Sequence, residues 1–268
     1  MKMRSKSLLY LYTVCLSVVM FASCDTKDED ERFIEVEEPH INRPVLIEDF
    51  TGQKCINCPT AAVLIESLVE EYGDEAVVAV SIHGGSMSID EPMGLANEFG
   101  KMYNKYWNVE SWPSGLINRK GGVIKTDMWM GRIAYEMALT PHLDLEIENT
   151  YVSADNKLAI QVKVTGLDKD IEGKLQIWLT EDHIKAVQLM PDGKPNTAYE
   201  HNHVLRTAVN GEWGESIAVE KEKTKILTAE CDLSGKSWNL DNLYVVAFVY
   251  DDNGVQQVAR KAVVPSNC

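Results

Sequence analysis

The chain has 268 residues, 45% hydrophobic and 25% charged, a globular composition and a length that suits about two domains. Its 41 acidic residues outnumber its 26 Lys and Arg residues, so the formal net charge is −15. With no basic stripe and no Gly-rich phosphate loop, the sequence argues against a nucleic-acid partner and gives no sign of a cofactor.

Residues 1–23 have the pattern of a secretory signal peptide. Basic residues precede an apolar run from Leu8 to Ala22, which is short for a membrane span. The site Phe21-Ala22-Ser23-Cys24 resembles the lipobox of bacterial lipoproteins. That resemblance implies an acylated Cys24 that anchors the protein to a membrane; an ordinary cleaved signal is the alternative. The acidic, apolar-poor stretch at 24–42 reads as a solvated tether.

Residues 43–141 alternate strand and helix patterns in the order βαβαββα. The predicted elements are a strand at 45–50, a helix at about 59–72, a strand at 76–82, a helix at about 95–106, a hairpin from 115–118 and 123–124, and a helix at about 128–139. A strand, a helix and a second strand in succession favour a parallel pair with a right-handed crossover.

Residues 142–268 lose the helical period and alternate polar with apolar residues. The predicted strands are 143–148, 158–164, 175–180, 203–209, 225–231, 243–250 and 255–263. Short strands with one polar face, separated by turn residues, favour an immunoglobulin-like β-sandwich. Trp178, Trp213 and Trp238 belong to its core or rim, unless an exposed aromatic patch marks ligand or glycan binding.

The sharpest chemical feature is the segment from Asp49 to Pro59, where Cys55 and Cys58 lie between a predicted strand and a predicted helix. The partial positive charge at a helix N-terminus stabilises a thiolate, and Lys54 adds a cation beside Cys55. A thiolate is the form that attacks a disulfide, and a second Cys one turn later can resolve the mixed disulfide.

This segment resembles thioredoxin-like thiol:disulfide interchange domains. The resemblance implies an α/β thioredoxin-like fold over 43–141, attack by Cys55, resolution by Cys58, and proton transfer by a buried Asp49. It also implies a cis-proline facing the cysteines, for which Pro113 is the candidate. The Trp usual before the first Cys is Lys54 here, and the central Ile56-Asn57 pair leaves the redox direction open.

The whole chain is also similar to the 28-kilodalton outer-membrane protein family of envelope lipoproteins. The residues that carry this likeness are Asp49 to Cys55, His201-Asn202-His203-Val204-Leu205-Arg206 and Gly211-Glu212-Trp213-Gly214. The resemblance implies an outer-membrane location and a thioredoxin-like domain followed by a β-sandwich. It also implies adhesion or receptor roles as readily as redox ones.

Several alternatives stay open. The Cys55–Cys58 pair is either redox-active or a structural disulfide of an oxidising compartment, and a pairing of Cys231 with Cys268 is undecided. Asp49 is either a buried relay or a solvated acid, and Glu48 points to the other side of its strand.

Histidines offer a second set of candidates. His83 ends a predicted strand at the edge expected for Cys55, where it either moves a proton or serves as an ordinary loop residue. His201 and His203 alternate on a predicted strand, with His183 as a conceivable third metal ligand. Zinc needs four ligands and no second ligand pair is visible, so we expect no metal.

We therefore expect an outer-membrane lipoprotein that exchanges disulfides with envelope proteins or peptides through Cys55 and Cys58. The alternative is a surface binding or adhesion lipoprotein in which the thioredoxin-like domain is a scaffold. The oligomeric state is not readable from the sequence.

Overall fold

The computed structural model describes residues 41–264, which belong to one compact unit. The predicted signal peptide, nearly all of the predicted tether, Cys24 and Cys268 lie outside these residues. The first part of the described chain contains β1 (Val45–Thr51), α2 (Cys58–Tyr72), β2 (Val77–His83), α3 (Glu98–Tyr106), β3 (Ser114–Ile117), a 3-10 turn (Thr126–Met128) and α4 (Trp129–Met137). The predicted order is confirmed, except that the second arm of the hairpin shrinks to a Gly115–Ile124 bridge.

The β1–β2–β3 part of the sheet is buried on both faces. β1 pairs with β2 in parallel and with β3 antiparallel. On one face Val45 and Ile47 pack with α2 and α4, and on the other Leu46 and Phe50 pack with Tyr103 of α3. Burial on both sides explains why β1 and β2 read as apolar runs without alternation.

The second part of the described chain is almost entirely β. It contains β4 (Leu143–Val152), β5 (Lys157–Gly166), β6 (Ile171–Glu181), β7 (Ile184–Leu189), β8 (Pro195–His201), β9 (Val204–Ala208), β10 (Glu215–Val219), β11 (Thr224–Asp232), a 3-10 turn (Leu240–Asn242), β12 (Leu243–Asp251) and β13 (Gly254–Ala262). The sequence patterns did not reveal β7, β8 and β10.

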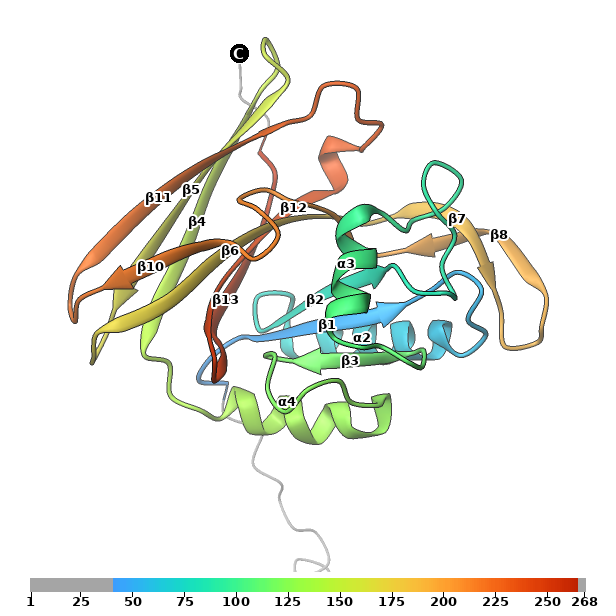
Figure 1. Ribbon diagram of the computed structural model, residues 1–268, viewed down its shortest axis with the longest axis horizontal. Helices are drawn as coiled ribbons and strands as arrows, with labels where there is room; N and C mark the ends of the chain where they lie inside the picture. The colour runs from blue at the N-terminus through green and yellow to red at the C-terminus, as the bar shows by residue number, and fades with distance from the viewer. Residues whose placement is uncertain (1–40, 265–268) are drawn as a thin grey trace, which may run out of the picture. The chain divides into compact units, whose positions relative to one another are not determined.

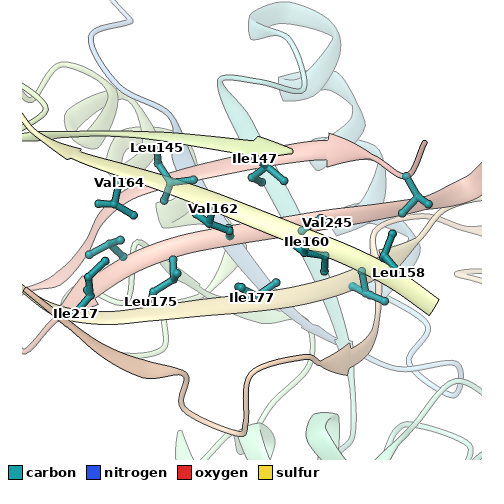
Figure 2. Close-up of a cluster of buried hydrophobic side chains, with 14 of the residues drawn as sticks. Leu145, Ile147, Leu158, Ile160, Val162, Val164, Leu175, Ile177, Ile217 and Val245 are labelled. Atoms are coloured by element: carbon teal, nitrogen blue, oxygen red, sulfur yellow. The ribbon is translucent and has the colours of Figure 1, made fainter. Parts of the chain in front are cut away.

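Two sheets pack face to face here, which confirms the predicted β-sandwich. The three-stranded sheet β11-β5-β4 lies over β6, β10 and β12 (Figure 1). Figure 2 shows Val162 and Val164 of β5 facing Leu175 and Ile177 of β6 across the interior. The strict alternation seen in the sequence of β4 and β5 follows from this one-sided burial.

The larger sheet does not stop at the predicted domain boundary between residues 141 and 142. Its strand order is β13-β12-β6-β9-β2-β1-β3, with β10 on β6. β9 bonds to β6 on one side and meets β2 on the other, through Ser81 and Val204. Strands from both predicted segments therefore share one sheet, because β9 supplies the partner that the edge of β2 lacks.

The β7–β8 hairpin forms its own two-stranded sheet. It projects beyond the end of β1, in gold in Figure 1, toward the loop that leads into α2. Among the described residues no helix is both long enough and apolar enough to cross a membrane.

Candidate functional site

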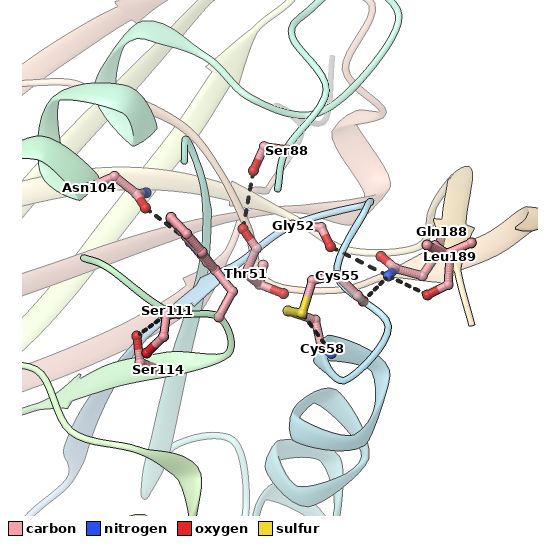
Figure 3. Close-up of a disulfide and its surroundings, with 11 residues drawn as sticks. Thr51, Gly52, Cys55, Cys58, Ser88, Asn104, Ser111, Ser114, Gln188 and Leu189 are labelled. Atoms are coloured by element: carbon pink, nitrogen blue, oxygen red, sulfur yellow. Dashed lines mark hydrogen bonds between the residues drawn. A yellow bond between two sulfur atoms is a disulfide. The ribbon is translucent and has the colours of Figure 1, made fainter. Parts of the chain in front are cut away.

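The Cys55–Cys58 loop, residues 52–58, connects β1 to α2. Cys55 and Cys58 are joined by a disulfide, shown in Figure 3, with their Cα atoms 5.4 Å apart. Cys58 is the first residue of α2, and its backbone N–H donates to Cys55 Sγ over 3.1 Å. The sulfur of Cys55 thus lies at a helix N-terminus, where an N–H group is available to stabilise a thiolate.

Both cysteines are shielded from solvent. Cys55 is 6% exposed and Cys58 is 2% exposed. Apolar side chains of the loop, of α2 and of the segment after β2 are by contrast exposed: Ile56, Val63 and Met87. Lys54, the predicted cation beside Cys55, donates its backbone N–H to the Met87 carbonyl over 2.8 Å, which ties this segment to the loop.

The β7–β8 hairpin holds the Cys55–Cys58 loop from the other side. Gln188 Nε2 donates to the Cys55 carbonyl over 2.9 Å (Figure 3). Leu189 N donates to the Gln53 carbonyl over 2.8 Å. Gln53 Nε2 in turn donates to the Val187 carbonyl over 3.0 Å. Sequence reasoning missed these contacts, and the Asp192-Gly193 turn was the one sign of a hairpin.

Pro113 lies at the same edge of the sheet. Ser114, the next residue, is paired with Phe50 near the end of β1, and the Trp112–Pro113 bond is cis, as predicted. Figure 3 shows Ser111 and Ser114 near the disulfide, with the Ser114 hydroxyl donating to the Ser111 carbonyl over 2.7 Å.

Asp49 lines a cavity of about 110 Å³ that Cys58 also lines. Its side chain is 2% exposed, and Oδ1 has no hydrogen-bond partner within residues 41–264. Burial raises the pKa of Asp49 to about 8. Asp49 is therefore buried and is not a solvated acid.

His83 and His201 line the same cavity. Thr51 and His83 are register partners on β1 and β2, which brings His83 to the edge expected from the sequence. The rings of His83 and His201 lie 5.5 Å apart between centroids. Burial lowers the pKa of His83 well below its usual value and that of His201 to about 4, so both rings are neutral at pH 7.

His201 and His203 do not share a strand face, contrary to the sequence expectation. His201 ends β8, whereas His203 precedes β9 with a positive φ of 59°. His203 Nε2 lies 3.6 Å from Glu66 Oε1, and His203 lowers the pKa of Glu66 to about 2. No group of three or more His, Cys, Asp or Glu residues in the described chain is arranged to hold a metal ion.

Glu48 points away from Asp49, to the opposite side of β1, as the strand period predicted. Both of its carboxylate oxygens accept from Arg119, each over 2.9 Å, and both side chains are buried. The two neighbouring acids therefore have different environments: Glu48 has a cation, and Asp49 has none among its hydrogen-bond partners.

The chain has been compared with known proteins and solved structures. HBP35 of Porphyromonas gingivalis has a TM-score of 0.64 at 13% identity, over 86% of this chain and 79% of that one. The X-ray crystal structure of a protein from Agrobacterium tumefaciens has a TM-score of 0.51 at 11% identity, over 84% of this chain and 95% of that one. At such identities the likeness concerns the fold alone.

No curated protein matches the chain. The family model for outer membrane protein Omp28 matches residues 100–267.

Proposed function

We propose that this chain, which belongs to the Omp28 outer membrane protein family, is an envelope protein whose Cys55–Cys58 pair exchanges disulfides with other envelope polypeptides. The observation that carries the proposal is the shared cavity of Cys58 and the unpaired, buried Asp49. A purely structural disulfide has no use for such an acid.

The elements around the cysteines support a thioredoxin-like assignment for this part of the chain. A parallel β1–α2–β2 unit carries the cysteines at the start of α2, and antiparallel β3 follows Pro113. The β-sandwich that completes the chain is then an immunoglobulin-like addition.

The proposed reaction begins with the reduced protein. The Cys55 thiolate attacks one sulfur of a client disulfide; a new S–S bond forms, the client S–S bond breaks, and the departing client sulfur takes a proton. Cys58 then gives its proton to Asp49 and attacks Cys55 Sγ. The Cys55–Cys58 bond forms, the bond between Cys55 and the client breaks, and the released client thiolate takes a proton from solvent. The client leaves as a dithiol, reduced by two electrons, and the protein becomes the Cys55–Cys58 disulfide. The reverse sequence oxidises a client dithiol.

Asp49 is suited to the second step because its pKa lies at about 8, near that of a thiol. A carboxylate of ordinary pKa would be too weak a base to take a proton from Cys58. The neutral rings of His83 and His201 keep the cavity polar without adding a charge that would lower the pKa of Asp49.

The client is expected to be a polypeptide with apolar side chains beside its cysteine. Ile56 and Val63, on either side of Cys58 in the sequence, are exposed together with Met87. These side chains give an apolar surface around a buried disulfide, so a client has to contact them to reach Cys55.

The test is an exchange assay with a fluorescent disulfide-bonded peptide and the reduced full-length chain. Replacing Cys55 with Ser should abolish exchange, and Cys58→Ser should trap a mixed disulfide. Cys231→Ser, which changes a cysteine outside this site with no disulfide partner among residues 41–264, should react like the wild type. Equal rates in the wild type and Cys55→Ser would end the proposal.

A structural role for the disulfide is the second candidate, and the burial of both Cys55 and Cys58 favours it. The chain would then be a binding or adhesion protein that keeps this part as a scaffold. Reduction potentials separate the two: exchange catalysts lie at roughly −270 to −120 mV, and structural disulfides below about −300 mV.

Membrane attachment is proposed to occur through acylation of Cys24, which lies outside the described residues. Cys24→Ser should then abolish labelling with a radioactive fatty acid and release the protein from the membrane fraction. Membrane retention of an unlabelled Cys24→Ser protein would contradict the anchor.

A further inference from the structure

A second cavity, of about 600 Å³, lies between the end of α3, the loop from β9 to β10 and the turn from β12 to β13. It shares no lining residue with the cavity of Asp49 and Cys58. Its walls are the aromatic side chains of Tyr106, Trp107, Trp213 and Tyr250, all of them at least partly exposed. The volume falls within the range of small-molecule sites, about 300–1,000 Å³.

The family motif Gly211-Glu212-Trp213-Gly214 shapes one wall of this cavity. Gly214 has a φ of +66°, and a Cβ there would lie 2.2 Å from the Leu175 carbonyl oxygen, so no other residue fits. Tyr250 donates its hydroxyl to the Trp213 carbonyl over 2.7 Å. The turn is therefore fixed on both sides, and the Trp213 ring is held 4.3 Å from that of Tyr106 between centroids.

The buried Arg119 forms the floor of the cavity. Its Cζ lies 4.6 Å from the ring centroid of Tyr250 and 5.8 Å from that of Trp213. Because Glu48 neutralises Arg119, the floor does not select for an anion. Because the guanidinium already covers these rings, they do not form a cage for a second cation. The ligand that fits is electrically neutral.

Polar groups surround the aromatic walls. Lys174 offers a donor, Asp252 an acceptor and Ser216 a hydroxyl that serves as either. Sugar rings combine apolar C–H faces with hydroxyls that donate and accept, which matches this set.

We propose that this cavity binds a neutral carbohydrate, through one or two pyranose rings of a glycan. The sugar stacks on the exposed rings of Tyr106 and Trp213, and its hydroxyls reach Asp252, Lys174 and Ser216. This binding is independent of disulfide exchange, because the two cavities have separate linings.

Isothermal titration calorimetry of the full-length chain with maltotriose, cellotriose, triacetylchitotriose and mannotriose tests the proposal, with sialyllactose as the acidic comparison. At least one neutral trisaccharide should bind. Tyr106→Ala and Trp213→Ala should each weaken binding by about tenfold, as expected when one stacking face is lost. Tyr106 is 63% exposed, so its replacement should leave folding intact.

Trp238→Ala is the matched control, because Trp238 lines a different cavity and its loss should leave sugar binding unchanged. The proposal is overturned if no neutral trisaccharide binds at millimolar concentration. It is equally overturned if Tyr106→Ala and Trp213→Ala both bind as tightly as the wild type, or if sialyllactose binds more tightly than every neutral sugar.

Discussion

Gln188 and Cys55 are 133 positions apart in the sequence, yet the Gln188 side-chain amide donates to the Cys55 carbonyl over 2.9 Å. Gln188 is buried, and the same Nε2 also lies 3.4 Å from the Gly52 carbonyl. A residue of the β-rich part of the chain therefore holds the backbone of Cys55 in place.

Replacing Gln188 with Ala should loosen the Cys55–Cys58 loop. The buried carbonyl of Cys55 loses its shorter hydrogen bond and keeps only the 3.4 Å contact from Cys58 N, which should lower the free energy of unfolding by about 1–3 kcal/mol. The reduced variant should also react faster with iodoacetamide at Cys55, because the loop opens more often. Gln161→Ala, which removes a bond on the exposed face of β5, should change neither quantity. An alkylation rate equal to that of the wild type would show that the hairpin does not restrain the loop.

Asp49→Asn should change how stability depends on pH. The folded pKa of Asp49, about 8, lies above the ordinary value of 3.8, so the native state keeps a proton that the unfolded state releases. The wild type should therefore lose stability as pH rises from about 4 to 8, and Asp49→Asn should not. At pH 9 the variant should be the more stable by roughly 2–5 kcal/mol. Urea unfolding of the oxidised proteins at pH 5, 7 and 9 measures this, and parallel profiles would refute it.

His201→Gln should reduce the sensitivity of the fold to acid. Burial lowers the pKa of His201 to about 4, below the ordinary 6.5, so the unfolded state binds a proton that the native state lacks. Stability conferred by the neutral ring is present above pH 6.5 and is lost as pH falls toward 4, by about 1–3 kcal/mol. His183→Gln, at an exposed ring whose pKa is raised by its hydrogen bond to Glu200, should not reduce the acid slope, because that ring gains stability as pH falls. Urea unfolding midpoints of each protein at pH 7 and 5 measure the loss of stability in acid. A loss in His201→Gln as large as that of the wild type would contradict the prediction.

Glu48→Gln should destabilise the protein strongly. It leaves the guanidinium of Arg119 buried among aromatic rings without a counter-charge, which typically costs about 3–5 kcal/mol. The double change Glu48→Leu with Arg119→Met should recover part of that loss, since it removes both charges. Lys157→Ala, in an exposed pair with Glu230, should leave the unfolding midpoint where it is. A double variant less stable than Glu48→Gln would contradict this account of the buried pair.

Gly214→Ala and Gly131→Ala should shift stability in opposite directions. A Cβ at Gly214 meets the Leu175 carbonyl oxygen at a positive φ, and the variant should lose about 1–3 kcal/mol. A Cβ at Gly131, inside α4, meets nothing within 4 Å, and the variant should gain about 0.5–1 kcal/mol. Thermal unfolding of the two variants provides the comparison, and a neutral Gly214→Ala would show that the turn adapts.

Local patterns carried most of the fold. β1 and β2 are buried on both faces and therefore have apolar runs. α2 is buried along one stripe, which gives its 3.6-residue period, and β4 and β5 are buried on one face, which gives their alternation. Each of these patterns is visible in the sequence, so these elements could be predicted. The β7–β8 hairpin could not, because Ile184–Leu189 and Pro195–His201 are mixed in polarity and do not build a core. Its contacts are backbone and amide hydrogen bonds, which leave no periodic signal.

The candidate site shows the same division. The predicted site residues lie near the end of β1, the start of α2 and the start of β3: Asp49, Cys55, Cys58 and Pro113. Their place at one edge of the sheet could be predicted because it depends on the order of these elements, which the thioredoxin-like resemblance supplied. Gln188, Tyr199 and His201 reach the site from a distant hairpin, and the spacing of His201 and His203 suggested a shared strand that does not exist. Such long-range neighbours are decided by how strands pair, which one sequence does not reveal.

The position of β9 in the large sheet has a consequence for how the protein is made. During synthesis the chain emerges from its N-terminus, so β2 is available long before Val204 arrives to pair with Ser81. Throughout that interval an apolar strand edge, Val77 to His83, is exposed and able to pair with other chains. A chain cut short after α4 would be an unfinished sheet prone to aggregate, so the part that carries Cys55 and Cys58 could not be inherited as a free-standing module.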